Sequence, residues 1–274
     1  LAYEAATADL NDVNMIDPYH LEAYGITTVN YNRDVEIFPV VSAMLRLVSG
    51  ECPYKSPTDM GVNMAGNCIT DDEGTQKAAK DEIIRRYYKA LCDMRKGIAE
   101  GPKATKIEIM MNKAGITTAD RPVIAAAAKK AADTDAPAVA WELPNGTIVT
   151  GKTSSLLGAI SAALLNAIKA LGNLPKDMPL ISPEIIAPIQ SLKTDHLGNH
   201  NPRLHTDEVL IALAVSALTN PTAKYAVELI DGLRGSEIHS TVILSQVDEN
   251  VLKKLGCHLT CDPIYQSKKL YHRR

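Results

Sequence analysis

The segment that decides the fold runs from Val139 to Thr150 and reads VAWELPNGTIVT. Two runs with β-branched and aromatic residues flank Asn145-Gly146, and Asn-Gly in that setting is the strongest short-range signal for a β-hairpin. After Gly151 to Ser155 comes an apolar stretch, Leu156–Leu171, which we expect to form a helix. The segment therefore predicts a hairpin followed by a helix.

Downstream of this hairpin, predicted strands alternate with predicted helices. The expected strands cover 179–182, 238–244 and 257–261, and the expected helices cover 183–192, 206–218, 221–233 and 246–255. Strands separated by helices favour a sheet with helices on both faces. We therefore expect residues 117–274 to form a three-layer α/β/α domain.

Upstream, residues 1–116 read as helices joined by polar loops, with the clearest helix from Asp72 to Ala99. We expect an all-α domain over 1–116. Its polar residues include a row with helical spacing, which lines a cleft between the two domains or simply faces water: Lys55, Asp59, Asn63 and Asn67.

Composition excludes several classes of protein. The net charge is −3, with no extended basic face, so we expect no nucleic-acid partner. No apolar stretch is long enough to span a bilayer, and we expect no membrane partner. The five cysteines are odd in number and irregularly spaced, which favours reduced thiols and a cytoplasmic location.

The chain opens on Leu1, so we expect a piece of a longer protein.

Several stretches resemble one uncharacterised bacterial family, the domain of unknown function 1846: Leu1–Gly25, 31–34, 54–66, 151–159, 201–214, 220–224 and 239–251. The resemblance covers nearly the whole chain. It implies a protein about twice as long, whose amino-terminal half carries a phosphate-loop-like segment, and it leads us to expect only the family's carboxyl-terminal half here. The family has no established activity, so the resemblance implies none.

The hairpin with its following helix is also similar to the opening of cytidine-deaminase-like folds. Zinc deaminases of that fold need His or Cys two residues before a Glu, and later Pro-Cys-x-x-Cys. The corresponding positions read SSLLGA over 154–159 and SPEIIA over 182–187. We therefore expect the fold without its zinc residues, and we assign no metal and no cofactor.

Residues 146–153 satisfy the phosphate-loop pattern G-x-x-x-x-G-K-[ST], but the intervening residues are β-branched and are better explained as a hairpin strand. A milder hypothesis remains, in which an anion binds where the next helix begins. It would use Lys152, Thr153, Ser154 and Ser155. The alternative is ordinary N-capping by Ser or Thr.

A second candidate lies in the polar loop before Thr206. We select Arg203 to face an anion and His205 to transfer a proton as the catalytic residue, because loops held by rigid layers often carry sites. The alternative is a polar loop whose Thr206 caps the next helix. His239 lies in an apolar strand and is better explained as a core histidine.

Together these features suggest part of an enzyme that binds a small anionic ligand, bearing phosphate or carboxylate, at a helix N-terminus. The alternative is a structural or oligomerisation module supporting a nucleotide-binding half that the chain lacks. In both cases we expect a homo-oligomer.

Overall fold

The structure is a computed structural model that describes residues 31–53, 72–98 and 102–266. The chain falls into two compact units, each considered by itself. Unit 1 comprises Leu1–Arg86 and Ile107–Asp120, and unit 2 comprises Tyr87–Lys106 and Arg121–Arg274. The predicted row at Lys55, Asp59, Asn63 and Asn67 lies outside the described residues.

Unit 1 is helical where the structure describes it. It contains α3 (Tyr31–Ser49), the first part of α5 (Asp72–Lys96), most of α6 (Pro102–Ala114) and the short η2 (Thr118–Asp120). Ion pairs one turn apart line α5, as in Lys77–Asp81 at 2.8 Å. Such pairs stabilise a helix by a few tenths of a kcal/mol (~0.2–0.5) each.

Unit 2 is built on a mixed sheet, whose described strands follow the order β2-β1-β3-β4. The strands are β1 (Ala138–Glu142), β2 (Ile148–Lys152), β3 (Glu237–Ser240) and β4 (His258–Cys261). β1 runs antiparallel to both β2 and β3, whereas β3 and β4 are parallel. The mixed α/β character predicted for this part of the chain is confirmed.

The predicted hairpin is present as β1 and β2. Gly146 has a φ of +80° in the turn, a conformation that glycine adopts without steric cost. Gly151, the second glycine of the phosphate-loop pattern, lies inside β2 and has a different role. A Cβ on Gly151 would lie 2.3 Å from the backbone nitrogen of Ala163 in α8 (Ala159–Leu171). The glycine therefore allows α8 to pack directly against the strand.

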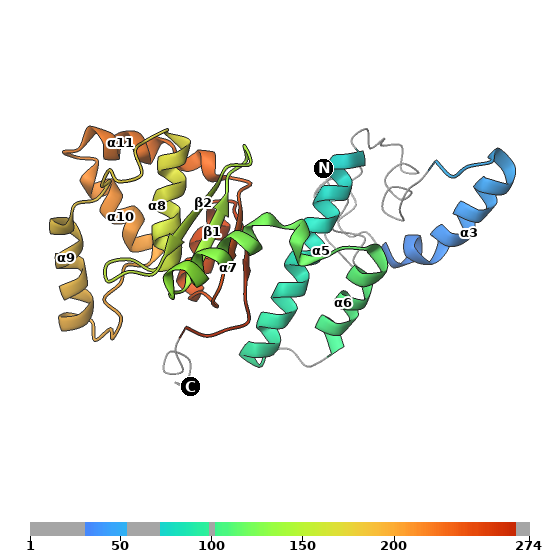
Figure 1. The fold of residues 1–274 in the computed structure, drawn as a ribbon, viewed down its shortest axis with the longest axis horizontal. Helices are drawn as coiled ribbons and strands as arrows, with labels where there is room; N and C mark the ends of the chain where they lie inside the picture. Colours follow the sequence, from blue (N-terminus) through green and yellow to red (C-terminus); the bar gives the residue numbers. More distant parts are fainter. Residues whose placement is uncertain (1–30, 54–71, 99–101, 267–274) are drawn as a thin grey trace. The chain divides into compact units, whose positions relative to one another are not determined.

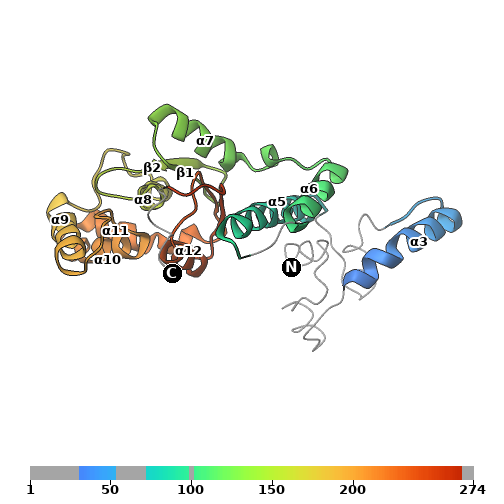
Figure 2. The ribbon, with the colours of Figure 1, turned by 90° about the horizontal axis from the view of Figure 1, so that it is seen from below.

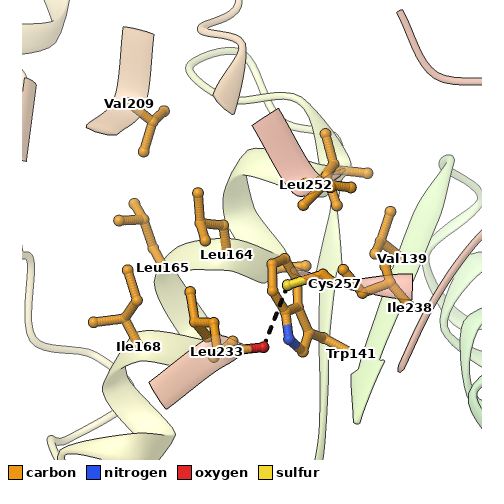
Figure 3. Close-up of a cluster of buried hydrophobic side chains, with 14 of the residues drawn as sticks. Val139, Trp141, Leu164, Leu165, Ile168, Val209, Leu233, Ile238, Leu252 and Cys257 are labelled. Atoms are coloured by element: carbon orange, nitrogen blue, oxygen red, sulfur yellow. Dashed lines mark hydrogen bonds between the residues drawn. The ribbon is translucent and has the colours of Figure 1, made fainter. Parts of the chain in front are cut away.

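Helices cover both faces of the sheet (Figure 1). In Figure 2, α7 (Pro122–Thr134) lies above the strands, and α8, α10 (Thr206–Ser216), α11 (Pro221–Glu228) and α12 (Gln246–Lys254) lie below them. The main core lies on the α8 side, where Trp141 of β1 and Leu164 of α8 are completely buried (Figure 3). Alternate residues of β1 face α7, since Ala140 packs with Val123 and Ala127.

The end of α5 that belongs to unit 2 packs on β3 and β4. The Tyr88 ring lies 5.0 Å from the ring of His239, and the Cys92 thiol donates a hydrogen bond to the carbonyl of Cys261. At the other end of the same strands, Arg121 is buried and donates to the carbonyls of Ile238 and His258. These contacts hold the two parallel strands together from one side.

Three predicted elements differ from the structure. The helix expected from Leu156 begins at Ala159, and residues 153–158 form a loop. Residues 179–182 form no strand; Leu180 and Ile181 are buried in the core without a neighbouring strand. β3 stops at Ser240, because the hydroxyl of Ser240 bonds to the backbone of Val242 and turns the chain. In the last two cases apolar residues are buried as coil, which periodicity alone cannot distinguish from a strand.

Candidate functional site

The candidate site lies where the chain leaves the sheet. Ser240, at the carboxyl end of β3, pairs with Val139, and Lys152, at the carboxyl end of β2, pairs with Ala138. Because β1 runs antiparallel to both strands, the loops that follow β2 and β3 emerge at the same edge. Ligands in open α/β sheets bind outside the carboxyl ends of strands, so this edge is the place to look for a site.

The loop after β2 is joined to the loop before α10. Leu157 and Leu204 form a parallel bridge, and Leu204 N donates to the Leu156 carbonyl at 3.0 Å. The Nε of Arg203 donates to the Ser154 carbonyl at 2.6 Å. The two candidate segments predicted from the sequence, 152–155 and 203–205, therefore adjoin each other.

The amino end of α8 does not have the form that the sequence suggested. Thr153, Ser154 and Ser155 precede the helix, and the Ser154 hydroxyl accepts a bond from Leu157 N at 3.1 Å in a local turn. The Leu204 carbonyl accepts from Gly158 N and from the Ser161 hydroxyl, and the first residues of α8 are buried. The helix therefore begins at Ala159 and not, as predicted, directly after Ser155, and its amino end is covered by the chain itself. Lys152 is exposed at the end of β2.

His205 lies at the start of α10 and is bound to a carboxylate from α12. Its Nδ1 is 3.0 Å from Oδ2 of Asp248. The other oxygen, Oδ1, accepts from both the backbone nitrogen and the hydroxyl of Thr206, each at 2.9 Å. The carboxylate thus caps α10 and holds the imidazole at once.

Ser245, the N-cap of α12, completes this cluster without forming a nucleophilic triad. Its hydroxyl donates to Asp248 Oδ2 at 2.7 Å and lies 3.4 Å from Nδ1 of His205. An activated serine would have to donate to an imidazole nitrogen that is free to take its proton. Here the serine donates to the carboxylate, so its role is to support Asp248.

The contacts determine how the pair ionises. The hydrogen bond to Asp248 raises the pKa of His205 above its ordinary value, against the opposing effect of burial. Burial by itself disfavours the charged form of Asp248, but the hydrogen bonds from His205, Thr206 and Ser245 outweigh it and lower the pKa of that carboxyl. The imidazole is about one-third exposed (33%) and Asp248 is buried (5%). The site thus offers solvent an imidazole fixed on a buried carboxylate.

A buried ion pair lies behind the imidazole. Lys193, in the π-helical turn η3 (Leu192–His196), donates to Glu208 Oε2 and to the Arg203 carbonyl, both at 2.6 Å. Glu208 Oε2 also accepts from the backbone N–H of His205 at 2.8 Å. This role of Lys193 was not predicted, because no local sequence pattern indicates that a lysine is buried. Asp248 had one signal, since it stands three residues after Ser245 in a capping pattern.

Other polar candidates do not join this cluster. His196 and His200, in the same polar segment, are exposed. His239 is buried and bonds to Thr260, and its Nε2 lies 3.4 Å from Asp262 Oδ1, so the interpretation as a core histidine is confirmed.

Buried thiols offer no nucleophile at this edge. Burial raises the pKa of the Cys92 thiol to about 11 and also raises that of Cys261, which pairs with Ser240 at this edge, so both are protonated at neutral pH. Within the described ranges, no group of three His, Cys, Asp or Glu side chains could hold a metal ion. Within the same ranges, no helix is long and apolar enough to cross a membrane.

Comparison with known proteins identifies the family. Residues 1–115 match the domain described as "Domain of unknown function DUF1846, N-terminal", and residues 119–271 match "Domain of unknown function DUF1846, C-terminal". The chain belongs to the DUF1846 family. The expectation that it holds only this family's carboxyl-terminal half is wrong, because the family's N-terminal domain matches as well.

Among relatives, a UPF0371 protein of Streptococcus thermophilus (strain ATCC BAA-491 / LMD-9) is 59% identical over 273 residues. A UPF0371 protein of Streptococcus pneumoniae (strain JJA) is 58% identical over 273 residues. Both alignments cover 100% of this chain and 55% of the relative. The chain thus spans about half the length of the curated relatives it matches.

Proposed function

We propose that unit 2 binds a small molecule bearing phosphate or carboxylate beside Arg203 and His205, and that His205 exchanges a proton with it. The observation that supports this most strongly is the pair formed by His205 and Asp248, in which the carboxylate is buried and the imidazole is accessible. The proposed ligand does not bind at the amino end of α8, because that helix end is covered by the chain.

The chemistry follows from the orientation of the ring. With Nδ1–H held by Asp248, Nε2 is the nitrogen that remains for a ligand. The neutral ring can take a proton there, and the protonated ring can donate to an anionic oxygen. Arg203, two residues earlier, supplies a guanidinium suited to phosphate or carboxylate, anchored through Nε to Ser154. Lys152, Thr153 and Ser155 belong to the proposed site as neighbours of Ser154.

The proposal is tested by thermal unfolding with inorganic phosphate as the probe. Ligand at a hundred times its dissociation constant should raise the free energy of unfolding by about 2.7 kcal/mol. Arg203→Ala should abolish the rise, whereas Arg46→Ala, which removes an exposed guanidinium of unit 1, should keep it. No response of the wild-type chain to phosphate, or an equal response of Arg203→Ala, would remove the basis of the proposal.

A second candidate function, support of an assembly, is favoured by the outer face of α10. Three apolar residues of α10 face solvent there, Ile211, Ala214 and Val215, and Leu218 is exposed in the turn that follows the helix. Exposure reaches 63% for Ile211 and 82% for Leu218. Exposed apolar stripes of this kind mark interaction sites. In this candidate the chain is a homo-oligomer supporting the part of the family's chain that it does not span. The oligomeric state of wild type and of Ile211→Asp, measured by sedimentation, tests this candidate. We expect an oligomeric wild type and a variant shifted to monomer; a monomeric wild type would count against the candidate.

We also propose the finer fold assignment. The hairpin β1–β2 followed by α8 supports a cytidine-deaminase-like arrangement for unit 2, and the positions expected to hold zinc ligands, 154–159 and 182–187, carry none. We further propose a division into a helical domain over 1–116 and an α/β domain over 117–274. Limited proteolysis would then cleave the chain preferentially near residue 116. Buried thiols outside any disulfide at Cys92, Cys257 and Cys261 support a cytoplasmic location.

A further inference from the structure

Lys193 is the most deeply buried charged side chain near the candidate site. Its side chain is 4% exposed, and a buried ammonium is unfavourable unless it is paired and hydrogen-bonded. It has two acceptors, the Glu208 carboxylate and the Arg203 carbonyl. Both lie within two or three residues of His205, so its contacts converge on the segment that carries the proposed site.

The backbone around Lys193 is unusual in the same place. η3 is a single π-helical turn, in which Leu197 N donates to Leu192 O at 3.1 Å and Asn199 N donates to Lys193 O at 2.9 Å. Turns of this kind are rare and occur often at functional sites. Here the turn begins directly after α9 (Pro183–Ser191) and carries the lysine that reaches Arg203 and Glu208.

We propose that Lys193 is a positioning residue, which fixes the segment 203–205 so that Arg203 and His205 face the same ligand. The mechanism has two parts. The ammonium binds the carbonyl of Arg203 directly, and it holds Glu208, whose carboxylate accepts the backbone N–H of His205. The backbone is thereby fixed on both sides of Leu204, and the ring is directed to Asp248. This inference rests on the proposed function for its ligand, but its effect on the imidazole is independent of any ligand.

Charged groups from each neighbouring element act on His205, and they allow a sharp test. Asp248 of α12 and Glu208 of α10 raise the pKa of His205, and Lys193 of η3 lowers it; Arg203 lies in the preceding loop. Removing only the charge of Lys193 would therefore raise the titration midpoint. Loss of positioning would release the ring from Asp248 and lower the midpoint toward that of an ordinary imidazole, about 6.5.

The experiment follows the Cε1–H resonance of His205 through a pH titration in wild type, Lys193→Met and Lys193→Arg. Lys176→Met, in an exposed stretch of the same unit, is the control. We expect the midpoint to fall in Lys193→Met, to recover at least partly in Lys193→Arg, and to stay at the wild-type value in the control. A midpoint that rises or does not move in Lys193→Met would overturn the positioning role.

Phosphate binding, measured by calorimetry on the same proteins, provides the second readout. We expect a loss of affinity on the order of tenfold in Lys193→Met and little change in the control, since support of a binding group by its surroundings carries effects of this size. If wild type binds no phosphate, the proposed function fails while the titration still decides the role of Lys193.

Should Lys193→Met fail to fold, Lys193→Gln replaces it. That variant removes the same positive charge but keeps a polar group in the site. Loss of the charge alone would raise the His205 midpoint, so we expect the same downward shift only if positioning is lost, and an unchanged or higher midpoint would again overturn the proposal.

Discussion

In the part of unit 2 that the structure describes, two pairs of histidine and aspartate have opposite exposure. In the first pair His205 is 33% exposed and Asp248 5%. In the second pair His239 is 1% exposed and Asp262 30%, with 3.4 Å between His239 Nε2 and Asp262 Oδ1. The same two residue types therefore give an accessible imidazole on a buried anchor in one case and a buried imidazole beside an accessible carboxylate in the other.

The surroundings explain the contrast. Asp248 receives donors from His205, Thr206 and Ser245, which keep it ionised in spite of burial. His239 lies beneath Tyr88, whose pKa is raised to about 12 by burial and by nearby Asp262, and its Nδ1 bonds to Thr260. The comparison teaches that burial of the carboxylate, and access to the imidazole, distinguish a pair suited to proton exchange from one that belongs to the core.

The largest effect is expected from Asp248→Ala, which removes the acceptor that links α10 to α12. The variant leaves the buried N–H and hydroxyl of Thr206 without their acceptor, at about 1–3 kcal/mol for each group, so we expect a total loss of about 2–6 kcal/mol. Urea unfolding measures the change in the free energy of unfolding. A loss below about 1 kcal/mol would show that Asp248 does not anchor the pair.

His239→Ala tests the other pair. It removes a fully buried ring and its bond to Thr260, and we expect a loss of about 2–3 kcal/mol in the free energy of unfolding. Phosphate affinity, measured on the folded variant, should stay at the wild-type value. A large drop in affinity would assign the second pair to the site and erase the contrast.

A pH-dependent effect should belong to His205. Since its pKa is raised on folding, its stabilisation is complete below about pH 6.5 and disappears as pH rises through the folded-state value. Since the pKa of Asp248 is lowered, the stabilisation from that group is lost as pH falls below about 4.

The difference in unfolding free energy between wild type and His205→Gln should therefore be greatest between about pH 4 and 6.5. In an Asp248→Asn background this dependence should vanish, because the partner charge is gone. A difference independent of pH in the wild-type background would contradict the ionised pair.

The smallest effect is expected from Asp262→Asn. An accessible carboxylate contributes little to stability even beside a histidine, so we expect a loss below about 1 kcal/mol. Thermal unfolding of Asp262→Asn and of Asp248→Asn, measured side by side, compares the loss of stability caused by neutralising each carboxylate. Equal losses would mean that the exposure of the carboxylate does not distinguish the pairs.

The sequence predicted two separate candidate segments, Arg203 and His205 in a polar loop and the residues 152–155 before a helix; the structure joins the two loops through Arg203 and Ser154. Sequence patterns did not identify Asp248 or Lys193, because Asp248 lies 43 residues from His205 and Lys193 lies 15 residues from Glu208, and no local pattern predicts either contact. The sequence also predicted a helix from Leu156, three residues before its observed start at Ala159, because a loop of apolar and small residues looks like the first turn of a helix.

The sequence by itself determined the hairpin around Asn145-Gly146, the succession of helices and strands after it, and membership in a family, since these depend on local conformational preference and on the order of residues. Only the tertiary structure decided which histidine meets which carboxylate, and which partner of each pair reaches solvent. Those outcomes depend on burial and on contacts between distant segments, which no short stretch of sequence contains.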